Sequence, residues 1–320
     1  MPKADPSEAN PSEEDPSETD GSGADSSAQH PGPTPEASSA ADYRSGFVTV
    51  VGRPNVGKST LINRAVGYKV SIVSDKPQTT RHQIRGILNR SDGQMIFVDT
   101  PGLHRPRTAL GERTNATASD TLGGVDLVCM LVEAHAKIGP GDKWIAKRLP
   151  PETILIVNKI DRAKPDQIVE RLGTALEFDF AEYFPISAQT GAGVPELVDH
   201  LMARLPIGPQ LYPDDMITDA PEKFWIAELV REQLLAVMDQ ELPHSIATRV
   251  TEYEWPRIRC EILVERDSQK GMVIGKGGKV LKAVGTAVRK DLPEGAFLEL
   301  HVAVEKDWQR HAHLVERLGF

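Results

Sequence analysis

The stretch Gly52-Arg53-Pro54-Asn55-Val56-Gly57-Lys58-Ser59 directly follows the apolar run 47–51. It matches the pattern G-x-x-x-x-G-K-[ST], and a strand, a glycine loop and a helix in this order form a phosphate cradle. Main-chain N–H groups of the loop can surround a β-phosphate, Lys58 can reach the β- and γ-oxygens, and the Ser59 hydroxyl can ligate Mg²⁺. The pattern therefore predicts a nucleoside triphosphate site over residues 52–59 and the adjacent Thr60.

A second signal is the tetrapeptide Asp99-Thr100-Pro101-Gly102, which follows the apolar strand pattern 95–98. At this place Asp99 is a candidate partner of Mg²⁺, and the Gly102 N–H would face the γ-phosphate. Pro and Gly also suit an ordinary turn at the end of a strand, so the tetrapeptide alone leaves both interpretations open.

The polar segment 76–82, Lys-Pro-Gln-Thr-Thr-Arg-His, has no helical period. A threonine hydroxyl here could complete the Mg²⁺ ligands only while a γ-phosphate is present. We therefore expect the segment to be ordered by the triphosphate and to loosen after hydrolysis. We favour Thr80 over Thr79 as the ligand, beside Ser59 and Asp99.

The base is predicted to be read by Asn158-Lys159-Ile160-Asp161, which follows the apolar strand pattern 153–157. A carboxylate at Asp161 can accept hydrogen bonds from guanine N1–H and from the exocyclic amine, a pair that adenine does not offer. Asn158 would tie this loop to the phosphate loop, and the Lys159 stem would lie along the purine. Ser187-Ala188 would offer a backbone N–H to guanine O6.

These motifs, in this order and spacing and together with Gln78-Thr79-Thr80-Arg81-His82 and Leu103-His104, resemble the bacterial Era family of GTPases over residues 46–320. Leu103 stands where Ras-like proteins carry a water-orienting Gln, and His104 is expected to be a loop residue rather than a base. The resemblance implies that Asn55 recruits K⁺ beside the phosphates. Slow intrinsic hydrolysis that depends on Mg²⁺ and is helped by K⁺ or by a partner is expected, with Asn55, Lys58, Thr80 and Gly102 acting in it.

Composition divides the chain. Residues 1–42 hold ten carboxylates against Lys3 and almost no large apolar side chain, which predicts a disordered acidic tail. We expect this tail to be an inert linker rather than a competitor for RNA. The tail accounts for the whole net charge of −9, so the remainder is neutral. No apolar stretch reaches membrane-spanning length and the start lacks a secretory pattern, while Cys129 and Cys260 read as buried thiols in a reducing cytosol.

From residue 46 to 205, strand-like and helix-like runs alternate, which predicts an α/β P-loop GTPase domain with a mostly parallel sheet. Its motifs all follow strand ends, where such sheets bind ligands. Residues 206–220 contain three prolines and no period, which predicts a linker.

Residues 221–320 predict a smaller α+β domain. An amphipathic helix over 222–240 precedes strands over 246–254 and 257–265, the turn Gly275-Lys276-Gly277-Gly278, a helix to Lys290 and a strand over 297–305. This order is typical of a type II KH domain, whose G-x-x-G turn clamps about four nucleotides. Phe224 and Trp225 are expected in its core. Six Lys or Arg and no acid lie between residues 270 and 290, and the predicted RNA-binding residues are Gly275, Lys276, Gly277, Gly278, Lys279 and Lys282.

The resemblance further implies a cytoplasmic, monomeric protein that binds the 3′ end of 16S ribosomal RNA during assembly of the 30S subunit. It also implies peripheral contact with the inner membrane, for which the sequence gives no independent sign. Two alternatives stay open: an RNA-binding assembly factor that holds GTP as a structural ligand, and another translation-linked GTPase whose C-terminal domain binds protein.

Overall fold

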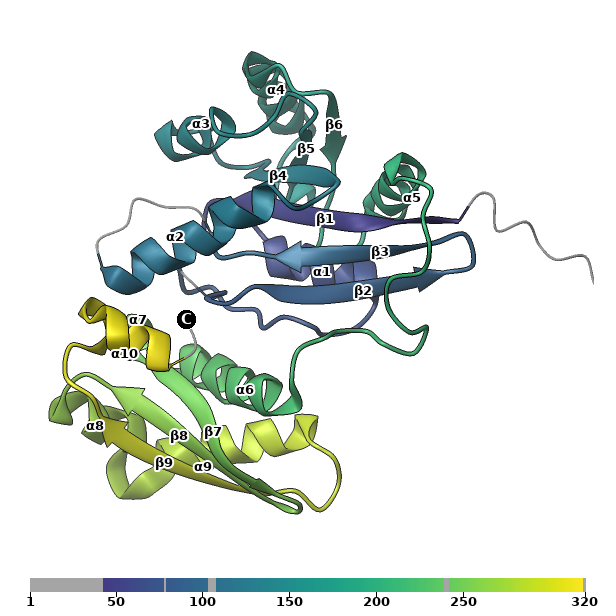
Figure 1. The fold of residues 1–320 in the computed structure, drawn as a ribbon. Helices are drawn as coiled ribbons and strands as arrows, with labels where there is room; N and C mark the ends of the chain where they lie inside the picture. The colour runs from purple at the N-terminus through teal and green to yellow at the C-terminus, as the bar shows by residue number, and fades with distance from the viewer. Residues whose placement is uncertain (1–42, 78, 103–107, 239–241, 319–320) are drawn as a thin grey trace, which may run out of the picture. The chain divides into compact units, whose positions relative to one another are not determined.

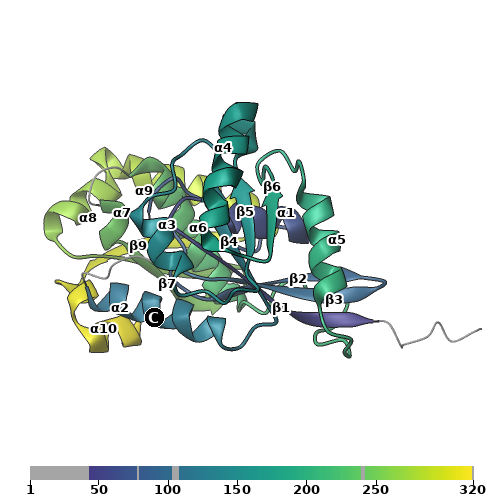
Figure 2. The ribbon, with the colours of Figure 1, turned by 90° about the horizontal axis from the view of Figure 1, so that it is seen from above.

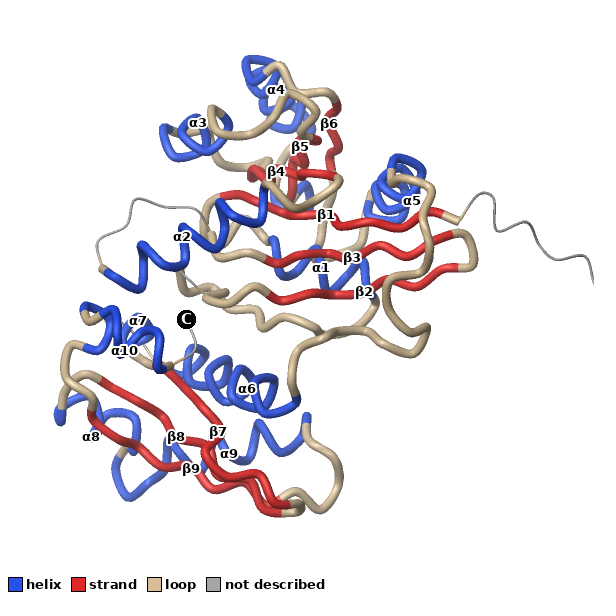
Figure 3. Tube along the Cα trace, viewed as in Figure 1, coloured by secondary structure: helices blue, strands red, loops and turns tan. Residues whose placement is uncertain are grey.

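The computed structural model describes residues 43–77, 79–102, 108–238 and 242–318, and these residues carry two β-sheets (Figure 3). The predicted acidic tail, Gln78, Leu103 and His104 lie outside the described residues. Ala41–Phe320 form one compact unit, so contacts between the two sheet domains belong to a single body.

The first sheet has the strand order β2-β3-β1-β4-β5-β6. Strand β2 runs antiparallel to β3 and every other neighbouring pair is parallel, which confirms the predicted mostly parallel sheet. The strands are β1 (Arg44–Gly52), β2 (Ile84–Arg90), β3 (Gly93–Asp99), β4 (Leu127–Glu133), β5 (Ile154–Asn158) and β6 (Glu182–Pro185).

Helices cover both faces of this sheet (Figures 1 and 2). Strand β4 shows why: Cys129 and Leu131 belong to one apolar cluster, whereas Val128 and Met130 belong to the other, as the two-residue period of a strand requires. One cluster contains residues of α1 (Lys58–Val66) and α5 (Val194–Arg204). The other contains residues of α2 (Ala109–Leu122), α3 (Pro140–Ala146) and α4 (Pro165–Ala175).

The predicted linker, residues 206–220, forms no helix and follows the edge of the first sheet. Buried Gln94 fixes it: Oε1 accepts from the N–H groups of Leu211 and Tyr212, each at 2.8 Å, and Nε2 donates to the Tyr212 carbonyl at 2.8 Å. The N–H of Ile87 also donates to the Ile217 carbonyl at 2.9 Å. The segment is therefore bound to the first domain along its length.

The second sheet has three strands, β7 (Ala247–Glu254), β8 (Arg257–Val264) and β9 (Phe297–Val304). Strands β7 and β8 are antiparallel, and β8 and β9 are parallel. Its core takes apolar residues from α6 (Glu222–Val237), α8 (Asp267–Ile274) and α9 (Lys279–Val288). Two short helices, α7 (Leu242–Ser245) and α10 (Ala312–Arg317), were not predicted from the sequence.

Several side chains singled out in the sequence have clear places. Cys129 and Cys260 are fully buried, and burial raises the pKa of each thiol to about 12. Trp225 packs against the second core as expected, whereas Phe224 is half-buried and its ring meets His82 edge-on, with 5.0 Å between ring centroids. Among the described residues, no helix combines the length and apolarity needed to cross a bilayer.

Candidate functional site

The loop between β1 and α1 has the backbone of a phosphate cradle. Gly57, with φ +103°, directly precedes α1, and Asn55 also has a left-handed backbone, with φ +65°. The N-cap residue Gly57 has no side chain that could cap α1, so the first N–H groups of the helix stay available to a ligand in the cavity beside them. A helix N-terminus of this kind favours an anion.

Lys58 lies over this loop. Its side chain is buried, and Nζ is 3.4 Å from the Gly52 carbonyl oxygen and 3.3 Å from that of Arg53. Burial lowers the pKa of Lys58, while the nearby Asp99 carboxylate acts in the opposite direction. An ammonium held this way can exchange its two weak carbonyl contacts for phosphate oxygens.

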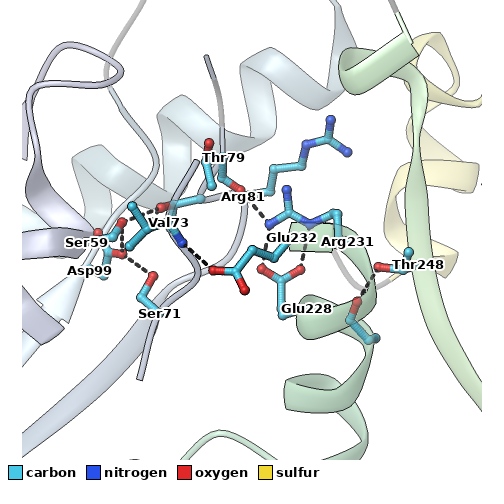
Figure 4. Close-up of polar contacts among 12 residues, drawn as sticks. Ser59, Ser71, Val73, Thr79, Arg81, Asp99, Glu228, Arg231, Glu232 and Thr248 are labelled. Carbon is cyan, nitrogen blue, oxygen red and sulfur yellow. Dashed lines mark hydrogen bonds and ion pairs between the residues drawn. The ribbon is translucent and has the colours of Figure 1, made fainter. Parts of the chain in front are cut away.

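The carboxylate of Asp99, at the end of β3, accepts hydrogen bonds from three hydroxyl groups (Figure 4). Its Oδ2 accepts from Ser71 at 2.6 Å, from Ser59 at 2.8 Å and from Thr80 at 3.3 Å. Burial raises the pKa of Asp99, and the hydrogen bonds and Lys58 oppose that effect. Ser71, which the sequence analysis missed, lies in a segment without a recognisable motif.

These residues fit a Mg²⁺ ion. Ser59 and Thr80 line the cavity with their hydroxyl oxygens 3.1 Å apart, and Asp99 lies behind them, fully buried. The second carboxylate oxygen of Asp99 is buried without a hydrogen-bond partner among the described residues. Hydroxyl and carboxylate oxygens are the ligands that Mg²⁺ takes in phosphate sites. Thr79 instead donates its hydroxyl to the Lys76 carbonyl at 2.7 Å, which favours Thr80 as the ligand.

Asn158 joins the predicted base loop to the phosphate loop. Its Nδ2 donates to the Val56 carbonyl at 2.8 Å, and its Oδ1 accepts from the Ala188 N–H at 2.9 Å. Lys159 spans the same gap, because Nζ donates to the Asn55 carbonyl at 2.6 Å and pairs with Glu133. The three loops are therefore held as one unit.

Asp161 presents its carboxylate to the cavity, with one oxygen accepting from the Ser187 hydroxyl at 2.5 Å. The expected N–H donors of Ser187-Ala188 are engaged differently: Ala188 donates to Asn158, and Ser187 donates to the Ala192 carbonyl at 2.8 Å. Both N–H groups therefore have protein partners in this structure, one within loop 187–192 and the other in Asn158.

The cavity has a volume of about 310 Å³ and brings the motifs together. The predicted residues that line it are Pro54, Asn55, Gly57, Lys58, Ser59, Thr60, Thr80, Gly102, Asn158, Lys159, Asp161 and Ala188. Lining residues that were not predicted are Ile72, Val73, Ser74, Asp75, Thr79, Arg162 and Gln189.

The remaining predicted residues support the cavity from outside. Val56 and Thr100 are buried, and Arg53 bonds to the buried Asp142 at 2.8 Å. Pro101 is buried beside Gly102, where a Cβ would lie 3.1 Å from the Pro54 nitrogen and 3.2 Å from Lys58 Nζ. Asn55 donates through Nδ2 to the Asp75 carbonyl and so ties the phosphate loop to the segment before residue 76.

The second candidate site is the loop 275–278 between α8 and α9. Gly275, Gly277 and Gly278 all have positive φ, at +72°, +60° and +74°. A Cβ at Gly275 would lie 2.4 Å from a methyl of Val280, whereas a Cβ at Gly277 or Gly278 would meet nothing within 4 Å. The backbone of the last two glycines is therefore open to a ligand. Of the predicted lysines around this loop, Lys276 is exposed, and Lys279 and Lys282 belong to the first turn of α9.

Comparisons with known proteins identify families for both domains. Residues 47–159 match a family described as 50S ribosome-binding GTPase, and residues 241–309 match the KH domain family. A crystal structure of Era in complex with MgGDPNP and nucleotides 1506–1542 of 16S ribosomal RNA is 35% identical, with a TM-score of 0.83, and the match covers 87% of this chain and 99% of that one. A tyrosine-to-alanine variant of Aquifex aeolicus Era bound to GDP·AlF4⁻ is also 35% identical, with a TM-score of 0.81, and the match covers 86% of this chain and 99% of that one.

The junction of Gly57 and Asn158 can be tested against a matched glycine. A Cβ at Gly57 would lie 2.3 Å from Asn158 Nδ2, whereas one at Gly67, with φ +81°, would meet nothing within 4 Å. Both changes to Ala cost about 1–2 kcal/mol of unfolding free energy from the left-handed backbone. Only Gly57→Ala should also abolish binding of fluorescent GDP. The new methyl group would displace Asn158, which links the phosphate loop to the base loop. Equal GDP affinity in both variants would contradict the proposed role of this junction.

Proposed function

Because this chain belongs to the Era family of GTPases, we propose that it is a Mg²⁺-dependent GTP switch that binds the 3′ end of 16S ribosomal RNA and acts in 30S subunit assembly. The observation that carries the proposal is that one chain holds both a cavity lined by the phosphate and base motifs and an open G-x-x-G backbone. The match extends over 99% of an Era chain that was crystallised with a GTP analogue and that RNA.

In this proposal each end of the nucleotide has its own residues. The start of α1 and Lys58 hold the β- and γ-phosphates, and Gly102 places its N–H at the γ-phosphate. Ser59, Thr80 and Asp99 hold Mg²⁺, which neutralises charge on the phosphates when bound. Asp161 selects guanine, and Lys159 lies along the purine.

The guanine assignment of Asp161 predicts a change of base preference. Asp161→Asn replaces an acceptor with an amide donor, which should weaken GTP binding by at least about a hundredfold and favour xanthosine triphosphate. Competition of the two nucleotides against fluorescent GDP measures the preference. Arg162→Gln, a change at the neighbouring cavity residue, is the control and should leave guanine preferred. If Asp161→Asn kept the guanine preference of the unaltered protein, Asp161 would not read the base.

The two sites should be separable by mutation. Gly277→Asp places a carboxylate in open space at a backbone that Asp tolerates, so the protein should fold and hydrolyse GTP normally. Affinity for single-stranded RNA with the 16S 3′-terminal sequence should fall by about tenfold or more, since the new charge repels phosphate. Lys58→Ala should show the reverse pattern, with GTP turnover lost and RNA binding kept.

Gly295→Asp is the matched control for the RNA loop, because Gly295 also has positive φ, at +90°, and open space around its Cβ position. It adds the same charge to the same domain outside the basic segment 270–290. Fluorescence anisotropy with labelled RNA should give unchanged affinity for this variant. If both variants lost RNA affinity equally, or if Gly277→Asp lost none, loop 275–278 would not be the RNA-binding site.

We further propose that K⁺ assists hydrolysis beside Asn55. The Asn55 side chain supports this proposal, because it reaches from the phosphate loop to the Asp75 carbonyl in the segment that follows α1. Turnover should then rise by on the order of tenfold in KCl over NaCl, since a cation near the phosphates offsets developing charge. Asn55→Gly keeps the left-handed backbone and should lose the response.

The same measurement addresses the alternative in which GTP is only structural. Turnover that is equal in KCl and NaCl, and unchanged by added RNA, would favour that alternative over a switch. Failure to bind any single-stranded RNA would instead favour a protein-binding C-terminal domain. Peripheral membrane contact and the monomeric state remain predictions from the family resemblance.

A further inference from the structure

Helix α6 of the C-terminal domain buries three charged residues along one side. Glu228, Arg231 and Glu232 are 4%, 2% and 8% exposed. Their spacing of three and four residues places them on one face of the helix, together with Phe224, which meets His82. This face contacts Val73, Thr79 and His82 of the nucleotide-binding domain, and Figure 4 shows Val73 and Thr79 beside it.

Arg231 links this face to the segment that carries Thr80. Its guanidinium donates to both carboxylate oxygens of Glu228, at 2.8 Å from Nε and 2.5 Å from Nη2. The same Nη2 is 2.5 Å from the carbonyl oxygen of Thr79, to which it also donates. A buried ion pair adds little net stability by itself, because desolvation offsets the attraction. The hydrogen bond to the Thr79 carbonyl lets the buried arginine hold the backbone of the nucleotide-binding domain in place.

The peptide bond after Thr79 carries this contact directly to the magnesium ligand. The Thr79 carbonyl and the Thr80 N–H belong to one rigid plane, so a donor that fixes the carbonyl also restricts the start of Thr80. In this arrangement the Thr80 hydroxyl lies 3.1 Å from Ser59 Oγ and 3.3 Å from Asp99 Oδ2. Glu228 in turn fixes the arginine with two charged hydrogen bonds.

Glu232 contacts the chain a few residues before Thr79, at Val73. One carboxylate oxygen accepts from the Val73 N–H at 3.0 Å, and the other accepts from Lys69 Nζ at 2.6 Å. The helix therefore contacts the backbone of the segment at residues 73 and 79, on both sides of Asp75, whose carbonyl accepts from Asn55. Two attachments on one rigid helix restrict the segment more than either would alone.

We infer that Arg231 is a positioning residue that the C-terminal domain supplies to the nucleotide site, where it holds Thr79 so that Thr80 meets Mg²⁺ and favours GTP over GDP. The inference rests on the proposed function, since it requires Thr80 to respond to the γ-phosphate. GDP lacks this group, so the contact adds affinity only for the triphosphate. By linkage, a ligand can shift the segment only through such a difference between states.

Two variants test the role. Arg231→Gln removes the cation, whereas Arg231→Lys keeps a cation beside Glu228 but cannot hold the carboxylate and the Thr79 carbonyl together. Both should bind GDPNP about tenfold more weakly while their GDP affinity stays within about twofold of that of the unaltered protein. The free Mg²⁺ concentration that half-saturates GDPNP binding should rise. If Arg231→Gln unfolds, Arg231→Lys still provides the measurement.

Arg249→Lys is the matched control, because Arg249 pairs with Glu261 at 2.7 Å within the same domain and away from the segment. It should leave both nucleotide affinities unchanged. If Arg231 had a merely structural role, its variants would have lower thermal stability and would bind GDP and GDPNP more weakly by the same factor. That result would overturn the inference. GDPNP affinity equal to that of the unaltered protein in both Arg231 variants would overturn it as well.

Affinity for RNA separates this inference from the function beneath it. In the unaltered protein, GDPNP and GDP should give different RNA affinities, and Arg231→Lys should lose that difference while keeping its RNA affinity without nucleotide. If the unaltered protein shows no difference, the proposed switch fails and the inference fails with it. If the variant keeps the full difference, only the role of Arg231 is wrong.

Discussion

The buried carboxylate of Asp99 is the point on which the nucleotide site depends. Its Oδ2 accepts hydroxyl hydrogens from Ser59 in α1, from Ser71 and from Thr80. A charged group at full burial is costly unless several donors compensate it, so the three hydroxyls are held where the carboxylate needs them. This need brings together parts of the chain that lie up to 40 residues apart. It also leaves Ser59 and Thr80 side by side at the wall of the cavity.

The parallel sheet explains why the motifs meet. Strands β1, β3 and β5 run in the same direction, so the phosphate loop, Asp99 and the base loop all leave the sheet at one edge. Short polar contacts then fix the loops to one another, mainly through Asn158 and Lys159. The protein's own contacts therefore hold the three loops in one arrangement.

Sequence reasoning reached the fold and most of this site because each motif carries local chemistry. Glycines with positive φ, a lysine after the loop and polar residues after apolar runs all specify their own surroundings. Ser71 and Arg231 carry no such local signal, because Asp99 lies 28 residues from Ser71 and Thr79 lies 152 residues from Arg231 in the chain. The donation from Ser187-Ala188 to guanine stays a prediction, because in this structure the Ser187 N–H bonds to the Ala192 carbonyl and the Ala188 N–H bonds to Asn158. The charges within the long helix α6 are visible in the sequence, but the pattern does not say what they face.

The contact between the two domains has the composition of an interface that can reorganise. One part is apolar and includes Leu110 of α2 with Trp308 and Leu314. The other part is polar: Arg81 donates to the Ile246 carbonyl at 2.6 Å, and Arg231 donates to that of Thr79. Burial, followed by the neighbouring Arg231, lowers the pKa of Arg81 to about 9, and Glu228 opposes this. Exposing such buried, paired charges to water costs little free energy, because hydration replaces the hydrogen bonds and ion pairs that they lose. If Arg231 positions Thr79 as inferred, a change at Thr80 would therefore loosen the polar part while the apolar part keeps the domains together.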